Sequence, residues 1–231
     1  MAAVLRVGWR FFTSAALAAC LLTGCGGGGS HLWQLISGTA AAGLPLAQAT
    51  VQVRCADGSV FHATANDFGI WQAVVDSPRL PCALQVSGGS FNGLPNTAVY
   101  HSVATSYGTH NITPLTNLVL ARLLGTAPDL WFATPDFTAV QAPALQTATT
   151  AVTQALGLEA ALRQANPLTD AFFASPLDYL DAVLEVMAST LADPAVNKSY
   201  AELLVAAAHA DFSGFASFAP TFAAKFVVPM Q

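Results

Sequence analysis

The sequence predicts an α+β protein with two domains, a small antiparallel β-sandwich followed by an α-helical domain. Two observations lead to this prediction. In residues 33–108, apolar side chains alternate with polar ones, as in strands that bury one face. In residues 109–231, apolar side chains recur every three or four positions, as on one face of a helix. The change of period marks the expected boundary between the domains.

The first 24 residues have the three zones of an export signal. Arg6 and Arg10 supply positive charge, an apolar stretch over residues 11–22 follows, and small residues precede Cys25. The apolar stretch is shorter than the roughly 20 residues that a transmembrane helix needs, and no charged stop follows it. The sequence therefore predicts that residues 1–24 are a signal peptide that is removed on export.

Leu22-Thr23-Gly24-Cys25, at the end of this signal, resembles the lipobox of bacterial lipoproteins. In that family the peptidase cuts before the cysteine, which is then acylated. The resemblance implies that Cys25 is the lipid attachment site and that the chain meets the membrane through this lipid. The glycine-rich residues 25–32 would form a flexible tether. Gly26 stands where an aspartate would favour the inner membrane, so the resemblance favours the outer membrane of a Gram-negative bacterium.

The charge of the chain argues against two classes of partner. The sequence has 13 acidic and 8 basic residues, which gives a net charge of −5. A sparse and acidic set of charges argues against nucleic acid and against electrostatic binding to anionic lipid. Hydrophobic residues make up 54% of the chain, but none of its segments after the signal reaches about 18 consecutive apolar residues. We therefore expect no second membrane segment.

The four cysteines predict a single disulfide. Cys20 leaves with the signal peptide and Cys25 is assigned to lipid, so that Cys55 and Cys82 remain. Disulfides persist in an oxidising compartment outside the cytoplasm, and we expect a Cys55–Cys82 bridge there. A two-cysteine metal or redox site is the alternative, but the sequence has no CxxC spacing and no cluster of ligands near either cysteine.

Alternation and turns define the predicted strands of the sandwich. In two of them apolar residues occupy every second position: Val51, Val53 and Cys55 in one, and Cys82, Leu84 and Val86 in the other. Turns are indicated at Asp57-Gly58 and at residues 66–69, before a strand over residues 70–75. Each cysteine shares the apolar face of its strand, so the predicted disulfide lies in or beside the core.

Three stretches of this region resemble the carboxypeptidase-regulatory-like, or transthyretin-like, sandwich repeat. They are Ile36-Ser37-Gly38-Thr39, residues 43–53 and Asp67-Phe68-Gly69-Ile70-Trp71. The family pattern has a Ser-Gly strand, a turn and strand with the pattern Gly-x-Pro-Leu-Ala-Gly-Ala-x-Val, and an Asp-x-x-Gly-x-aromatic turn. Gln48 replaces the second glycine of that pattern. The resemblance implies a transthyretin-like or immunoglobulin-like sandwich that serves as a spacer, adhesive unit or binding domain, and it brings no catalytic residues.

Helix starts in the second domain are expected where a capping residue precedes proline: Thr113-Pro114, Thr134-Pro135, Ser175-Pro176 and Asp193-Pro194. A helix over residues 112–124 should end at Gly125. Another helix is predicted by an apolar stripe: Leu177, Leu180, Leu184, Met187 and Leu191. Ser199 and Glu202 form a capping box that opens a further helix, with Tyr200 on its inner face.

The polar residues predict no catalytic residues, no metal site and no cofactor. The five histidines lack the spacing of a metal site: His31, His62, His101, His110 and His209. His62 lies near Asp57 and Asp67, which the polar face of a hairpin explains. The sequence has no Gly-x-Ser-x-Gly elbow and no glycine loop of the phosphate-binding kind.

Two further patterns have both a functional and a structural interpretation. Asp178, Asp181 and Glu185 share a helix face, as a cation site or an acid–base pair would require; we favour a solvated flank beside the apolar stripe. The C-terminal phenylalanines form either a surface that binds a partner or membrane, or a core stripe: Phe212, Phe215, Phe218, Phe222 and Phe226. We favour the core, because Lys225 is the only basic residue of this stretch.

These observations predict an exported, lipid-anchored cell-envelope protein that is not an enzyme, with the sandwich as a structural or binding module. The alternative is a module that binds a small ligand or a glycan, and an exposed aromatic platform with Trp71 or Trp131 would favour it. A lipid-anchored hydrolase is a third hypothesis, which requires a cleft with convergent Asp, His and Ser side chains. The sequence identifies no protein or glycan partner.

Overall fold

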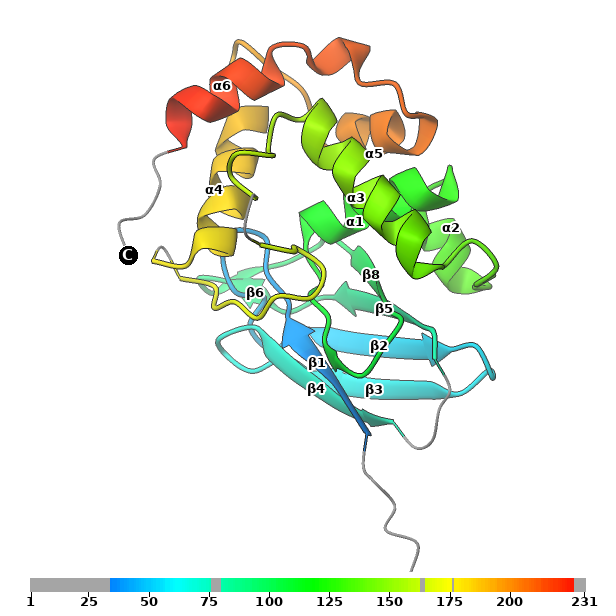
Figure 1. The fold of residues 1–231 in the computed structure, drawn as a ribbon. Helices are drawn as coiled ribbons and strands as arrows, with labels where there is room; N and C mark the ends of the chain where they lie inside the picture. Colours follow the sequence, from blue (N-terminus) through cyan, green and yellow to red (C-terminus); the bar gives the residue numbers. More distant parts are fainter. Residues whose placement is uncertain (1–33, 76–79, 163–164, 176, 227–231) are drawn as a thin grey trace, which may run out of the picture. The chain divides into compact units, whose positions relative to one another are not determined.

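The computed structural model describes residues 34–75, 80–162, 165–175 and 177–226, in which strands are followed by helices (Figure 1). The predicted α+β class is thereby confirmed. All of these residues belong to one unit of the chain, Leu32–Gln231. The predicted signal peptide, the tether and Cys25 lie outside the described residues.

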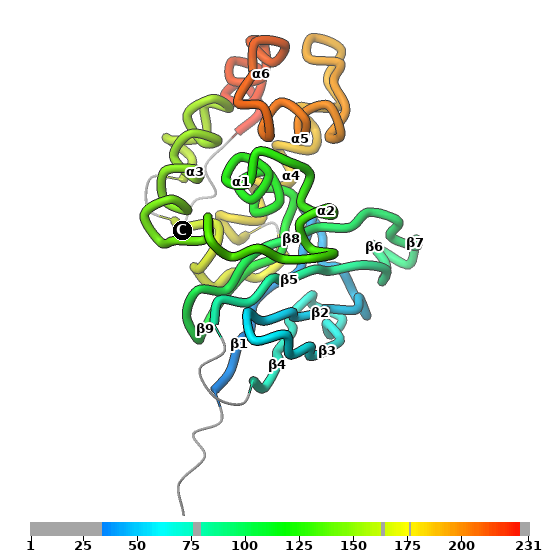
Figure 2. Tube along the Cα trace, turned by 90° about the vertical axis from the view of Figure 1, so that its right-hand side faces the viewer, coloured from blue at the N-terminus to red at the C-terminus, as the bar shows by residue number. Residues whose placement is uncertain are grey.

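Two sheets and a small hairpin make up the β-rich part (Figures 1 and 2). The larger sheet is antiparallel and has the strand order β3 (Val60–Thr64), β2 (Thr50–Cys55), β5 (Cys82–Ser87) and β8 (Tyr100–Ala104). The other sheet has the order β4 (Ile70–Val75), β1 (Gln34–Thr39) and β9 (Gly108–Thr109). In it β1 pairs antiparallel with β4 and parallel with β9. The hairpin consists of β6 (Ser90–Phe91) and β7 (Leu94–Pro95).

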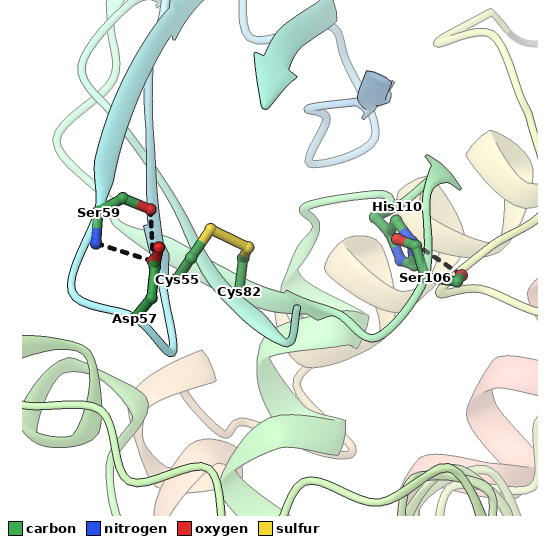
Figure 3. The surroundings of a disulfide bond; sticks show 6 residues. All are labelled: Cys55, Asp57, Ser59, Cys82, Ser106 and His110. Atoms are coloured by element: carbon green, nitrogen blue, oxygen red, sulfur yellow. Dashed lines mark hydrogen bonds between the residues drawn. A yellow bond between two sulfur atoms is a disulfide. The ribbon is translucent and has the colours of Figure 1, made fainter. Parts of the chain in front are cut away.

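The predicted alternation along the strands is confirmed, because the apolar positions form one buried cluster. Strands of both sheets contribute to this cluster, among them through Ile36, Val51, Val53, Trp71, Leu84 and Val86. Cys55 and Cys82 are directly opposite each other in the pairing of β2 with β5, and their sulfur atoms form the predicted disulfide (Figure 3). Asp57 closes the adjacent turn by accepting from the Ser59 backbone N–H at 3.1 Å.

The larger sheet also contacts the helices through its other face. Ala83 and Val103 belong to the same buried cluster as residues of the helices. Arg54 of β2 places its guanidinium 4.9 Å from the centre of the Phe132 ring, and its Nη1 donates to the Ala133 carbonyl oxygen at 3.0 Å. The sheet is therefore covered on both faces along β8, where every residue is buried, whereas every second residue of β3 is exposed.

The helical part has six described α-helices: α1 (Pro114–Leu124), α2 (Pro128–Ala133), α3 (Ala142–Ala155), α4 (Tyr179–Leu191), α5 (Tyr200–His209) and α6 (Phe218–Lys225). A short 3₁₀ turn, η1 (Ser213–Phe215), precedes α6. Helix α1 contacts α2, α3, α5 and strand β8, so it is the centre of this part. The core interpretation of the phenylalanines is confirmed for Phe215, Phe218 and Phe222, which are at most 5% exposed.

Helix α1 begins and ends as predicted. Thr113 is its N-cap, Pro114 its first residue, and Gly125 ends it in the left-handed conformation with φ 66°. The other three predicted starts are wrong. Helix α2 has already ended before Thr134-Pro135, Asp193-Pro194 lies in a turn, and α4 begins at Tyr179, after Ser175-Pro176.

The same residue pairs that cap helices also stabilise turns, which explains these errors. Asp193 accepts from the Ala195 backbone N–H at 2.9 Å and closes a turn instead of opening a helix. Asp178, rather than Ser175, caps α4 by accepting from the Leu180 N–H at 3.0 Å. Leu177, predicted as the first member of the apolar stripe, therefore lies before the helix and is 86% exposed.

Candidate functional site

A cavity of about 310 Å³ lies where α4 and the first turn of α5 meet the start of α1 and strand β8. We call it the α4–α5 cavity. Ten described residues line it: Ala42, Tyr100, Pro114, Leu184, Met187, Ala188, Leu191, Ala192, Lys198 and Tyr200. Small-molecule sites are typically concave, about 300–1,000 Å³ in volume, and mainly apolar with a few polar groups. The lining of this cavity has that character.

Helix α4 supplies the apolar wall of the cavity. Leu184, Met187 and Leu191 come from the stripe predicted from the sequence and are at most 8% exposed. Ala188 and Ala192 lie beside this stripe and are both exposed. Their short side chains leave space next to the stripe, where longer residues would fill the cavity.

The start of α5 supplies two of the polar residues, Lys198 just before the N-cap and Tyr200 in the first turn. The predicted capping box is confirmed: Ser199 Oγ accepts from the Glu202 N–H at 3.2 Å, and Glu202 Oε2 accepts from the Ser199 N–H at 2.9 Å. The box fixes the chain between Lys198 and Tyr200, which both line the cavity. Lys198 Nζ donates to Glu202 Oε1 at 3.1 Å. Hydrogen bonds from Ser199, with help from Lys198, lower the pKa of Glu202 to about 2.

Tyr200 joins the cavity wall to α1. Its hydroxyl donates to the Pro114 carbonyl oxygen at 2.9 Å and accepts from Asn117 Nδ2 at 3.0 Å. Burial raises the pKa of Tyr200, so its hydroxyl stays protonated and keeps donating at physiological pH. The hydroxyl is therefore already engaged with protein groups.

Tyr100, the first residue of β8, lies against Tyr200 in an edge-to-face arrangement with ring centres 5.9 Å apart. Its side chain is buried, with 8% of the residue exposed, and it lines the cavity. Burial raises its pKa, and no hydrogen bond adds to this shift. Within the described part of the chain, no hydrogen bond uses the Tyr100 hydroxyl. It is a polar group of the cavity wall that no described residue engages through a hydrogen bond.

A buried polar network behind Tyr200 joins β8 to α1. His101 Nδ1 lies 3.0 Å from Asn117 Oδ1, and Asn117 also bonds Tyr200. His101 Nε2 lies 2.9 Å from Gln85 Nε2 and 3.4 Å from Asp129 Oδ1. A neutral ring with the proton on Nδ1 donates to Asn117 and accepts from Gln85, which satisfies both nitrogens. Burial lowers the pKa of His101, although Asn117 and Asp129 oppose this effect.

The interpretation of Asp181 as part of a solvated flank is wrong. Asp181 is 1% exposed, and its Oδ1 has no hydrogen-bond partner among the described residues. Burial, with smaller contributions from Glu185 and Asp178, raises the pKa of Asp181 to about 7, against the weaker effect of the Ser175 backbone. The segment after β1 covers this helix face: a Cβ on Gly43 (φ +83°) would lie 3.1 Å from the Glu185 Cα.

The other polar candidates from the sequence do not converge. His62 is exposed on β3, while Asp57 and Asp67 are engaged in local contacts with Ser59 and Gln48. The polar-hairpin interpretation explains these contacts. Within the described ranges, no group of three or more His, Cys, Asp and Glu side chains is arranged to hold a metal ion.

One serine and histidine pair does lie close together, but its geometry does not suit nucleophilic catalysis. His110 is 2% exposed, and its Nε2 is 2.9 Å from the Ser106 carbonyl oxygen and 3.5 Å from Ser106 Oγ (Figure 3). Because a carbonyl oxygen only accepts, Nε2 carries the proton and cannot act as a base toward the hydroxyl. Burial lowers the pKa of His110, so the ring is neutral.

Trp71 and Trp131 do not form the exposed aromatic platform that a glycan site would require. Trp71 is 1% exposed and belongs to the sandwich core. Trp131 is 7% exposed, and its Nε1 donates to the Asp136 carbonyl oxygen at 2.8 Å. Neither ring is presented on an exposed loop.

No protein-family model, curated protein or solved structure matches this chain. In the ranges that the structure describes, none of the helices is long and apolar enough to cross a membrane. Sequence reasoning placed Met187 and Tyr200 on apolar faces but missed that they enclose a cavity with Tyr100. The only signal was the run of short side chains, Ala188 and Ala192, beside a leucine stripe.

Proposed function

We propose that this chain is an exported, lipid-anchored envelope lipoprotein without catalytic activity, and that its folded part binds a small, mainly apolar molecule in the α4–α5 cavity. The cavity carries the binding proposal, because its size and lining match those of small-molecule sites. Among the alternatives drawn from the sequence, a small-ligand module accounts for this cavity, whereas a purely structural role does not require one.

The location rests on the N-terminal residues and on the disulfide. The resemblance of residues 22–25 to a lipobox supports acylation of Cys25, and Gly26 supports the outer membrane of a Gram-negative bacterium. The Cys55–Cys82 disulfide supports a compartment outside the cytoplasm, where such bonds persist. The transthyretin-like resemblance supports the β-rich part as the membrane-proximal module of the protein.

The absence of catalysis rests on how the polar residues are used. His101 and His110 have ring nitrogens that donate to protein oxygens, and burial lowers the pKa of both. Lys198 and the tyrosines of the cavity are groups that position a ligand, and no described residue beside them forms a nucleophile–base pair.

Photolabelling of the acylated chain in phosphatidylcholine nanodiscs tests the binding proposal. Decanol with a diazirine at its chain end should label peptides of α4 and α5, which mass spectrometry identifies. Ala188→Trp should abolish this labelling, because Ala188 is an exposed residue of the cavity wall and its replacement fills the space. Ala223→Trp, at an exposed position of α6 that does not line the cavity, should label like the native chain. Equal labelling of the native chain and Ala188→Trp would refute the proposal.

A further inference from the structure

We propose that the ligand of the α4–α5 cavity is an anionic amphiphile, an aliphatic carboxylate whose head group contacts Lys198 and Tyr100. This inference rests on the proposed ligand-binding function and adds the chemical class of the ligand. It follows from the charge, the free hydrogen-bonding capacity and the apolar surface of the residues that line the cavity.

Lys198 is the only charged residue among the ten described lining residues. Its ammonium group donates to Glu202 at 3.1 Å, and its side chain is 35% exposed. Glu202 does not use up this cation: its Oε2 is held by the Ser199 N–H and hydroxyl at 2.9 Å, and an ammonium has further donors. A carboxylate in the cavity would share Lys198 with Glu202.

The adjacent helix ends carry charges of both signs: ionised Glu202 and the negative C-terminal end of α4 oppose an anion, whereas the N-terminus of α5 favours one. The N-terminus of α5 begins at Ser199, directly after Lys198, and the positive end of a helix favours negative charge. Asp193, just past the end of α4, is paired with Lys225 at 2.8 Å and is not drawn to Lys198. The last turn of α4 and its C-cap present only the apolar side chains of Ala188, Leu191 and Ala192 to the cavity.

Tyr100 supplies a neutral donor for the same head group. Its hydroxyl forms none of the hydrogen bonds among the described residues, whereas the Tyr200 hydroxyl already bonds Pro114 and Asn117. Hydrogen bonds from a neutral donor to a carboxylate are stronger than those to an alcohol. The raised pKa of Tyr100 keeps its proton available for such a bond.

The remaining wall suits an aliphatic chain. Leu184, Met187 and Leu191 present a continuous apolar stripe, and Ala42 closes it from the segment after β1. A methionine thioether chain adapts its shape to flexible ligands. A polar or multiply hydroxylated ligand, such as a sugar, would leave its groups without partners along this wall.

Three diazirine probes with the same chain separate this inference from the proposed function: decanoate, decanol and decyltrimethylammonium. Labelling of the cavity is measured against probe concentration in nanodiscs of phosphatidylcholine. We expect decanoate to reach half-maximal labelling at a concentration about tenfold below that of decanol. Lys198→Met should remove this preference, so that decanoate and decanol label that variant at equal concentrations, and Lys198→Arg should retain it. Tyr100→Phe should raise the concentration that decanoate requires.

The outcomes distinguish the two proposals. Equal labelling by decanoate and decanol, or stronger labelling by decyltrimethylammonium, would overturn the proposal that the ligand is anionic. Loss of labelling in Ala188→Trp would in that case still show that the cavity is the binding site. A preference for decanoate that persists in Lys198→Met would overturn the role of Lys198. Labelling of the cavity by none of the probes would overturn the proposed function and this inference with it.

Discussion

Replacing Asp181 by asparagine should flatten the pH dependence of the unfolding free energy. Asp181 is buried on α4 with one oxygen unpartnered, between Asp178 and Glu185 on the same helix face. A charged carboxylate is disfavoured there, so the folded chain keeps the proton to higher pH than the unfolded chain does. The contribution of Asp181 to the unfolding free energy is fully present below the pKa that it has in the unfolded chain. This contribution is lost as the pH rises through its pKa in the folded chain.

The magnitude follows from the two pKa values of Asp181, 3.8 for the free side chain and about 7 in the folded chain. Each pH unit between them corresponds to about 1.4 kcal/mol, so the full effect is about 4 kcal/mol. Between pH 5 and pH 8 the native chain should lose about 2–3 kcal/mol of unfolding free energy from this group alone.

Urea unfolding followed by tryptophan fluorescence at pH 5, 6, 7 and 8 measures this dependence. Asp181→Asn also buries an amide that lacks some of its hydrogen-bond partners, which lowers the unfolding free energy by an amount that does not vary with pH. The quantity to compare is therefore the slope of the unfolding free energy against pH. Glu159→Gln, at an exposed site on the turn after α3, serves as the control and should keep the native slope. Parallel curves for the native chain and Asp181→Asn would refute the argument, because the titration would then belong to other groups.

Three further variants test the anchor, the disulfide and the contact between α5 and α1. Cys25→Ala should abolish palmitate labelling and membrane retention, and unchanged fractionation would contradict acylation at this residue. Replacing Cys55 and Cys82 by serine should lower the unfolding free energy, measured by urea unfolding, by about 3.6 kcal/mol, as loop closure predicts. An unchanged unfolding free energy would show that the bridge does not form. Tyr200→Phe leaves Asn117 without its partner and should cost about 1–3 kcal/mol in the same assay.

The features that the sequence predicted correctly depend on neighbouring residues. Alternation placed Val53 and Leu84 in the sandwich core, and the Asp57-Gly58 turn was found because a hairpin needs that chemistry locally. The Ser199 capping box is complete within four residues of sequence, from Ser199 to Glu202. The disulfide was predicted because only one pair of cysteines remained once Cys25 was assigned to lipid.

The features that it missed depend on residues far apart in the chain. Asp181 has the spacing of an exposed helix flank but is buried in the fold, and the segment around Gly43, after β1, packs against neighbouring Glu185 of the same helix. Tyr100 and Tyr200 are separated by 100 positions, so no local pattern shows that their rings meet. The proline pairs failed for a different reason: Asp193 satisfies the same backbone group in a turn as a capping residue does in a helix.

Tyr200 gives the cavity a direct connection to the stability of the fold. Its ring lines the cavity, while its hydroxyl bonds Pro114 and Asn117 at the start of α1, and Asn117 in turn bonds His101 of β8. A ligand that fills the cavity binds only when α4, α5 and β8 are in place, so it must stabilise the folded chain by mass action. The polar network fixes this part of the cavity wall, because its hydrogen bonds would be lost if Tyr200 moved inward.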